Sequence, residues 1–229
     1  MRYFGGKTRT CKEIADIIKS LRYPDQLFVS PFVGGGWVES LLVDGAKYCC
    51  DKHPYLIAMY QELQKGWIPP KTLTKEEYDY IKGHKDEQPH LTGFVGFGCS
   101  FAGKWFGGYA KDKTNRNFCL NAHNSIMKKM KSFRNNTRFH CTDYKMLDPM
   151  DSIVYCDPPY QGTTEYSMGE FNHALFWETM RIWAKKNVVL VSEYNAPSDI
   201  KCIWQKSVKL DIRDKNNTKL PRVEKLFKV

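Results

Sequence analysis

The stretch Asp157-Pro158-Pro159-Tyr160 decides how this chain is expected to fold. It follows the apolar run Ile153-Val154-Tyr155-Cys156, which is short and comes directly after Asp151-Ser152. Such a run is typical of a buried strand. The two prolines end the strand because neither can donate a backbone N–H to a neighbouring strand. The sequence therefore predicts a stiff turn at the carboxyl end of a strand, where open α/β sheets bind ligands.

This turn suits the recognition of a planar amine. The Asp157 carboxylate can accept one N–H and the Pro158 carbonyl the other, while the Tyr160 ring stacks on a base, a contact worth about 1–3 kcal/mol. An amine held by two acceptors turns its lone pair out of conjugation and becomes a better nucleophile. The alternative is an ordinary proline-rich loop in which Asp157 is a cap, and the glycine loop at residues 34–36 argues against it.

That glycine loop follows a second expected strand, Leu27–Ser30, and precedes a helix expected from Trp37 to Val43. Strand, glycine loop and helix form the nucleotide-binding arrangement of doubly wound folds. The next strand, Ala46–Cys50, ends at Asp51. An acid there can accept hydrogen bonds from ribose hydroxyls, or cap the helix expected at Pro54–Leu63; the two roles are compatible.

The N-terminal stretch Tyr3-Phe4-Gly5-Gly6-Lys7 precedes a helical pattern from Lys12 to Leu21. Glycines before a helix let backbone N–H groups approach an anion, and Lys7 adds positive charge. Alone this is a weak signal. Together with the glycine loop and Asp51 it indicates a cofactor of the adenosine type.

Composition narrows the functional classes. The chain has 229 residues and a net charge of +10, and its Lys and Arg cluster between Lys104 and Arg138 around the single acid Asp112. This charge favours a nucleic-acid partner. None of the eight cysteines forms a C-x-x-C pair, which indicates reduced thiols and no metal site. The absence of a long apolar run or a signal peptide indicates a cytoplasmic protein without a membrane span.

Residues 93–109 hold six glycines and six aromatics, a texture that predicts a loop and excludes a regular helix. Such aromatics either stack on nucleic acid or pack onto the core. A helix is expected from Asn121 to Lys131. Its basic residues either contact the phosphates of a nucleic acid or form a face exposed to solvent. The candidate DNA-binding residues are Lys104, Trp105, Tyr109, Lys111, Arg116, Lys128, Lys129 and Arg134.

The remaining segments complete an α/β pattern. A helix with a capping box, Thr74 and Glu77, is expected near residues 74–82, and a strand at Arg138–Cys141 ends near Asp143. Gln161–Glu170 is interpreted as a mobile lid. Downstream we expect a helix at Asn172–Lys185, a buried strand at Asn187–Ser192, and two closing strands at Ile203–Ile212 and Val223–Val229 that form a hairpin across Asp214–Asn217.

In this order, the motifs resemble the D12 class of N6-adenine DNA methyltransferases, the DNA adenine methylase family. The resemblance rests on Tyr3…Gly5-Gly6-Lys7, Pro31–Gly36, Asp51 and Asp157–Tyr160, and it spans nearly the whole chain. It implies a Rossmann-like methyltransferase fold that uses S-adenosylmethionine. It also implies a double-stranded DNA substrate whose target adenine leaves the duplex.

The resemblance implies roles for individual residues. The catalytic set is Asp157, Pro158, Pro159 and Tyr160. The cofactor-binding set is Tyr3, Gly5, Gly6, Lys7, Phe32, Gly34, Gly36, Asp51, Asp143 and Asp157, with Lys7 near the cofactor carboxylate and Asp51 on the ribose.

The domain division follows from the same resemblance. Residues 1–84 and 137–229 are expected to form the catalytic domain, and residues 85–136 an inserted target-recognition region. Because this insert is short, we expect a short or relaxed recognition site. The alternatives are a methyltransferase acting on RNA adenine or on a glutamine amide, and a catalytically inactive nucleic-acid-binding relative. The sequence does not indicate an oligomeric state.

Overall fold

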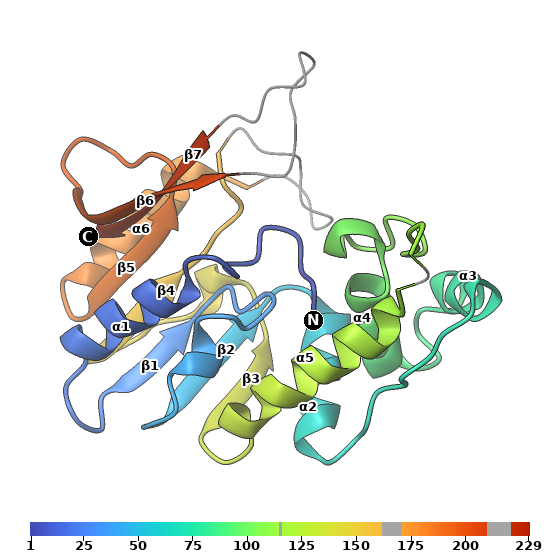
Figure 1. Ribbon diagram of the computed structural model, residues 1–229. Coiled ribbons are helices and arrows are strands. Elements are labelled where there is room, and N and C mark those ends of the chain that lie inside the picture. The colour runs from blue at the N-terminus through green and yellow to red at the C-terminus, as the bar shows by residue number, and fades with distance from the viewer. Residues whose placement is uncertain (115, 162–170, 210–220) are drawn as a thin grey trace.

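The computed structural model describes residues 1–114, 116–161, 171–209 and 221–229 (Figure 1). The helices are α1 (Cys11–Leu21), α2 (Pro54–Gln64), α3 (Lys75–Gly83), α4 (Pro89–Gly98), α5 (Phe118–Phe133) and α6 (His173–Ala184). The strands are β1 (Leu27–Ser30), β2 (Lys47–Asp51), β3 (Thr137–Cys141), β4 (Ser152–Cys156), β5 (Val188–Glu193), β6 (Lys201–Lys209) and β7 (Pro221–Lys228). The described residues also form three short 3₁₀ helices. These are η1 (Glu39–Leu41) between β1 and β2, η2 (Phe101–Gly103) between α4 and α5, and η3 (Tyr144–Met146) between β3 and β4.

The strands form one sheet in the order β3-β2-β1-β4-β5-β7-β6. The pairs from β3 to β5 are parallel, and β7 pairs antiparallel with both β5 and β6. The strand order reverses between β1 and β4, which makes their carboxyl ends the switch point where ligands bind in such sheets. The expected Rossmann-like α/β fold is confirmed.

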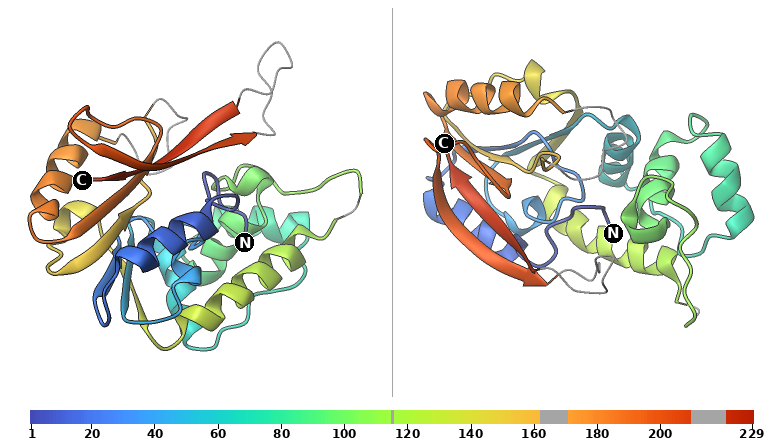
Figure 2. Two further views of the ribbon diagram at one scale, coloured as in Figure 1. Left: turned by 60° about the vertical axis from the view of Figure 1, so that its left-hand side comes forward. Right: turned by 90° about the horizontal axis from the view of Figure 1, so that it is seen from above.

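Helices cover both faces of the sheet (Figure 2). Alternating residues of β4 divide between the faces: Ile153 and Tyr155 pack in the cluster that contains α1, whereas Val154 and Cys156 pack with α6. A third cluster joins α2, α4 and α5 to β2 and β3. Because both faces of β4 are covered, every side chain of this strand is buried, as its apolar sequence predicts.

Most expected elements are confirmed within a few residues. The capping box at α3 has both of its hydrogen bonds, from Glu77 N–H to Thr74 Oγ1 and from Thr74 N–H to the Glu77 carboxylate. The closing strands β6 and β7 pair antiparallel. The expected hairpin connection at Asp214–Asn217 and most of the expected lid at Gln161–Glu170, with Gly162 and Gly169, lie outside the described residues.

The helix expected from Trp37 to Val43 is wrong. Only the 3₁₀ turn η1 forms there, and it ends at Leu41. Leu42, at φ −93° and ψ 89°, leaves the helical region directly after η1, and Gly45, in the left-handed region at φ +71°, then turns the chain towards β2. The backbone therefore stops being helical before Val43, and the side chain of Glu39 is buried.

The expectation that residues 93–109 exclude a regular helix is also wrong, because α4 includes residues 93–98. The glycines there serve close helix packing. A Cβ at Gly93 would lie 2.0 Å from the Tyr55 carbonyl oxygen of α2, and one at Gly96 would lie 2.3 Å from the Trp105 ring. Glycine normally destabilises a helix. In α4 this loss of stability is offset because Gly93 allows the backbones of α2 and α4 to approach closely.

The aromatics of this segment mainly pack onto the core. Phe94, Phe97 and Phe106 are buried in the cluster with α2 and α5, whereas Phe101 is 64% exposed. Of the two roles that the sequence left open, stacking on nucleic acid or packing onto the core, the buried rings have the second. Since α5 contributes Phe133 to the same cluster, the segment 85–136 shares its core with the sheet.

All eight cysteines are free thiols, six of them buried. Among the described residues, no helix combines the length and the apolar character needed to cross a bilayer. The described residues contain no cluster of three or more His, Cys, Asp or Glu side chains that could hold a metal ion.

Candidate active site

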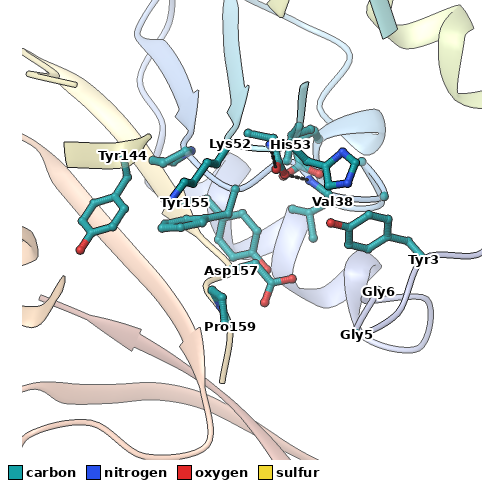
Figure 3. A pocket seen from close by; sticks show the side chains of 18 of the residues that line it. Tyr3, Gly5, Gly6, Val38, Lys52, His53, Tyr144, Tyr155, Asp157 and Pro159 are labelled. Carbon is teal, nitrogen blue, oxygen red and sulfur yellow. Dashed lines mark hydrogen bonds between the residues drawn. The ribbon is translucent and has the colours of Figure 1, made fainter. Parts of the chain in front are cut away.

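One pocket opens at the carboxyl ends of the parallel strands. The loops after β1, β2, β3 and β4 form its wall, together with the segment before α1 and the start of α6 (Figure 3). Every residue of the expected cofactor-binding set lines this pocket. The lining residues include Tyr3, Gly5, Gly6, Lys7, Phe32, Gly34, Gly36, Asp51, Asp143, Asp157 and Pro159.

The glycine loop turns sharply at the pocket wall. Gly34 and Gly36 have positive φ angles of 46° and 61°. A Cβ at Gly34 would lie 2.9 Å from the Tyr3 ring, and one at Gly36 would lie 2.9 Å from the Tyr60 hydroxyl. Side chains are therefore excluded at both positions by conformation and by space, which leaves backbone exposed to a ligand.

Asp51 is tied to the same loop. Its carboxylate accepts hydrogen bonds from the Gly34 N–H at 2.9 Å and from the His53 N–H at 3.0 Å. Burial raises the pKa of Asp51 to about 6, and these hydrogen bonds partly oppose the shift. At neutral pH the group is thus mainly an ionised acceptor that faces the pocket. The N-cap of α2 is His53, whose ring nitrogen accepts from the Leu56 N–H, so the alternative role of Asp51 as that cap is wrong. The role of Asp51 as an acceptor for ribose hydroxyls stays a prediction.

Asp157 lies opposite the N-terminal glycines. Lys7 Nζ is 2.6 Å from Asp157 Oδ1 and 3.8 Å from the Glu224 carboxylate. Burial alone would lower the pKa of Lys7, but the two carboxylates raise it above its ordinary value. Burial raises the pKa of Asp157, and the contact with Lys7 opposes this shift. This ion pair connects the N-terminal segment Gly5-Gly6-Lys7 to the turn Asp157–Tyr160 at one pocket.

Tyr160 is held at both ends of its ring. Its hydroxyl donates to Glu224 at 3.0 Å, and its ring meets Tyr194 edge-on at 4.6 Å between centroids. The Lys7 ammonium lies 4.5 Å from the centroid of the ring. A flat base that stacks on this face would have to displace Lys7.

Sequence reasoning missed two acids that support this corner, the half-buried Glu224 and the buried Glu193. Glu224 comes from β7, and Glu193, at the end of β5, accepts from the N–H groups of Gln161 and Tyr194. Burial raises the pKa of Glu193 to about 7. Neither acid belongs to a local motif, because the antiparallel end of the sheet brings them to Asp157. No spacing signal in the sequence could have found them.

The basic residues of the insert divide into two groups. Lys104, Lys111, Arg116, Lys128 and Arg134 are exposed. Lys129 is 5% exposed, and its ammonium donates to the Gly35 carbonyl and lies over the Trp37 ring.

The expectation that Lys129 contacts DNA is therefore wrong, because its charge is enclosed behind the glycine loop. Burial lowers the pKa of Lys129 to about 7. Its spacing from Ala122, Ile126 and Phe133, all buried on the same face of α5, is the signal that could have identified it.

Trp105 and Tyr109 are partly buried. The Trp105 ring stacks on Tyr55, and the Tyr109 hydroxyl donates to the Leu73 carbonyl at 2.6 Å. Their side chains thus already have intramolecular partners. A role in stacking on DNA would use only the exposed part of each ring.

The pocket has features of a ligand site for an adenosyl amino acid. Trp37 Nε1 and the Tyr144 hydroxyl belong to lining residues and are buried without a hydrogen-bond partner among the described residues. The ring centroids of Phe32 and Tyr144 are 5.3 Å apart, and the two rings provide apolar surface for a base. Asp51 provides an acceptor for hydroxyls. The residues present therefore fit S-adenosylmethionine.

A family model described as D12 class N6 adenine-specific DNA methyltransferase matches residues 3–95 and 102–210. This match covers most of the chain and includes the glycine loop, Asp51 and Asp157. No protein among the curated sequences matches the chain.

Solved structures of other methyltransferases are similar at low identity. A proposed RNA methyltransferase from Pyrococcus horikoshii is 10% identical, with 96% of this chain and 82% of that chain covered and a TM-score of 0.46. An rRNA methylase from Streptococcus thermophilus is 8% identical, with coverage of 97% and 98% and a TM-score of 0.42. A magnesium protoporphyrin IX methyltransferase from Synechocystis, solved with bound S-adenosylmethionine, is 7% identical, with coverage of 96% and 79% and a TM-score of 0.41.

Proposed function

Because the chain belongs to the D12 class of N6 adenine-specific DNA methyltransferases, we propose that it methylates the N6 atom of adenine in double-stranded DNA. Its methyl donor is S-adenosylmethionine, the cofactor of this family. The observation that carries the proposal is the contact between Lys7 and Asp157, which joins the amine-binding turn to the glycine-lined pocket.

When bound, the cofactor would supply a sulfonium methyl group. As the target N6 bonds to the methyl carbon, the carbon–sulfur bond would break, S-adenosylhomocysteine would leave and N6 would release one proton to water. For the protein we propose the following roles. Asp51 accepts from the ribose hydroxyls, Phe32 and Asp143 contact the adenine, and Gly34 and Gly36 allow close approach of the backbone. Tyr3 and Lys7 contact the amino-acid end from the opposite wall. All of these residues line the same pocket, which supports the assignment.

Asp157 and Pro158 then hold the target amine, and Tyr160 stacks on the base. The contacts of Lys7 support an ordered exchange. Its ammonium neutralises Asp157 and covers the Tyr160 ring. Movement of Lys7 towards the cofactor carboxylate would release both groups to the target adenine. The bond to Glu224 keeps the ring of Tyr160 in one orientation during this exchange.

Residues 85–136 are proposed to recognise DNA, and residues 1–84 and 137–229 to carry the transfer. The exposed Lys104, Lys111, Arg116, Lys128 and Arg134 are proposed to contact phosphates, with Trp105 and Tyr109 next to them. Because few side chains of this region remain for reading base edges, we propose a short or relaxed recognition site. Methylation mapped on random duplex DNA should show no single fixed site of about five or more base pairs.

The substrate class is tested by transfer of label from tritiated S-adenosylmethionine. We expect label in duplex DNA, recovered as N6-methyladenine, and little in RNA or protein of the same total mass. Label mainly in RNA would support the RNA-adenine alternative, and label in protein would support a glutamine amide. Cofactor binding without transfer to any of the three would support an inactive nucleic-acid-binding relative.

The proposed DNA surface is tested by removing two exposed charges of α5. The double variant Lys128→Ala, Lys131→Ala should bind duplex DNA more weakly and with a flatter salt dependence, the slope falling by up to about 2 because each phosphate contact contributes about 0.9. Anisotropy titrations at several salt concentrations measure this slope. Lys185→Ala with Lys186→Ala, an exposed pair after α6, should leave it unchanged.

A further inference from the structure

Glu39 is a buried carboxyl group on the pocket wall that has not been given a role above. It begins η1, directly after the glycine loop, and is 2% exposed. One of its carboxylate oxygens accepts from the Ser30 hydroxyl at 2.8 Å, at the carboxyl end of β1. It also lines the same pocket as Lys7 and Asp51. Glu39 therefore lies at the switch point of the sheet, where ligands bind.

This carboxyl group has no ion-pair partner of its own. None of the ion pairs formed within residues 1–114, 116–161, 171–209 and 221–229 includes Glu39. Lys129 is close enough to influence its charge, but the Lys129 ammonium is bonded to the Gly35 carbonyl. Burial raises the pKa of Glu39 to about 7, and hydrogen bonds from its own N–H and from Ser30 oppose the shift.

A buried carboxylate without a cation is unfavourable, so such a group either takes up a proton or meets a cation, which a ligand can supply. The amino-acid end of S-adenosylmethionine carries one ammonium and one carboxylate. The pocket offers one buried lysine, Lys7, and the buried acid Glu39 on its wall. A buried cation and a buried acid that both line the pocket are complementary to such a zwitterion.

We propose that Glu39 binds the α-ammonium group of S-adenosylmethionine. The Ser30 hydroxyl donates to one oxygen of this carboxylate, and the other oxygen is the one that the ammonium group would contact. This assignment concerns the cofactor only and does not depend on DNA being the substrate.

The test compares two ligands that differ only at this group. They are S-adenosylhomocysteine and its analogue in which hydrogen replaces the α-ammonium. By calorimetry, the wild-type protein should bind the first about 10- to 100-fold more tightly, the range expected for a hydrogen bond between charged groups. In Glu39→Gln, which keeps the shape of the side chain, the two affinities should become nearly equal.

A matched control is Glu193→Gln, which alters an equally buried carboxyl group outside the pocket lining. It should keep the wild-type affinity ratio. If Glu39→Gln also keeps the wild-type ratio, the proposal is wrong, even if both affinities fall, because Glu39 would then only support the shape of the pocket. The wild-type ratio tests the idea without any variant: a value near one contradicts it.

Discussion

Replacement of Asp157 by alanine is expected to reduce kcat by at least about 10²–10³-fold, the loss typical for one preorganised polar group at a reacting centre. The change removes the carboxylate that would accept from the target N6, so positioning of the amine is lost as well. Binding of duplex DNA should remain close to normal, because the proposed phosphate contacts lie in the insert. Single-turnover methyl transfer and anisotropy titrations separate the two effects.

The variant also leaves Lys7 in a buried site where, among the described residues, its remaining ion-pair partner is Glu224 at 3.8 Å. Loss of one partner of a buried ion pair is destabilising. Asp157→Asn, which keeps the shape, provides a second variant, and both should be assayed below their melting temperatures. Asp148→Ala, an exposed acid before β4, is the control and should keep normal turnover. Turnover retained in both Asp157 variants would contradict the assigned role.

Gly93→Ala is expected to have the largest effect on stability. A Cβ there would lie 2.0 Å from the Tyr55 carbonyl oxygen, so α2 and α4 would have to move apart. Overpacking of this kind costs about 1–3 kcal/mol and occasionally more. For a chain of this size each kcal/mol lowers Tm by about 2–4 °C. Thermal unfolding followed by circular dichroism measures the change.

Gly83→Ala is the matched control, because Gly83 is the last residue of α3 and an added Cβ would meet nothing within 4 Å. Alanine there should leave Tm unchanged or raise it slightly, since it restricts the unfolded chain. An equal Tm for Gly93→Ala and the wild-type protein would mean that α2 and α4 do not pack as closely as described.

The order of the elements and the pocket were predictable because local sequence controls them. The apolar run of β4 predicts a buried strand, and the two prolines after it predict a turn at the carboxyl end. Parallel strands bring their carboxyl ends to one edge, so the residues after β1, β2 and β4 had to meet there. The roles proposed for those residues rest on this shared position.

Other features depended on contacts that no local pattern encodes. The helix α4 forms despite its glycines because the absence of a side chain at Gly93 lets α2 pack against it. Lys129 appeared to be a surface charge, yet its place in the spacing of α5 directs it inwards to Gly35. Glu224 reaches Tyr160 only through the pairing of β7 in the sheet. In each case the tertiary partner is distant in sequence and decides the outcome.

The central claim is that the corner formed by Asp157, Pro158 and Tyr160 presents an adenine N6 to the methyl donor bound over the glycine loop. It is tested most directly by mass spectrometry of nucleosides from duplex DNA incubated with the protein and isotopically labelled S-adenosylmethionine. We expect the label in N6-methyl-2′-deoxyadenosine with the wild-type protein, and at least about 10²-fold slower labelling with Asp157→Ala. Label on another base, or equal labelling of adenine by the variant, would contradict the claim.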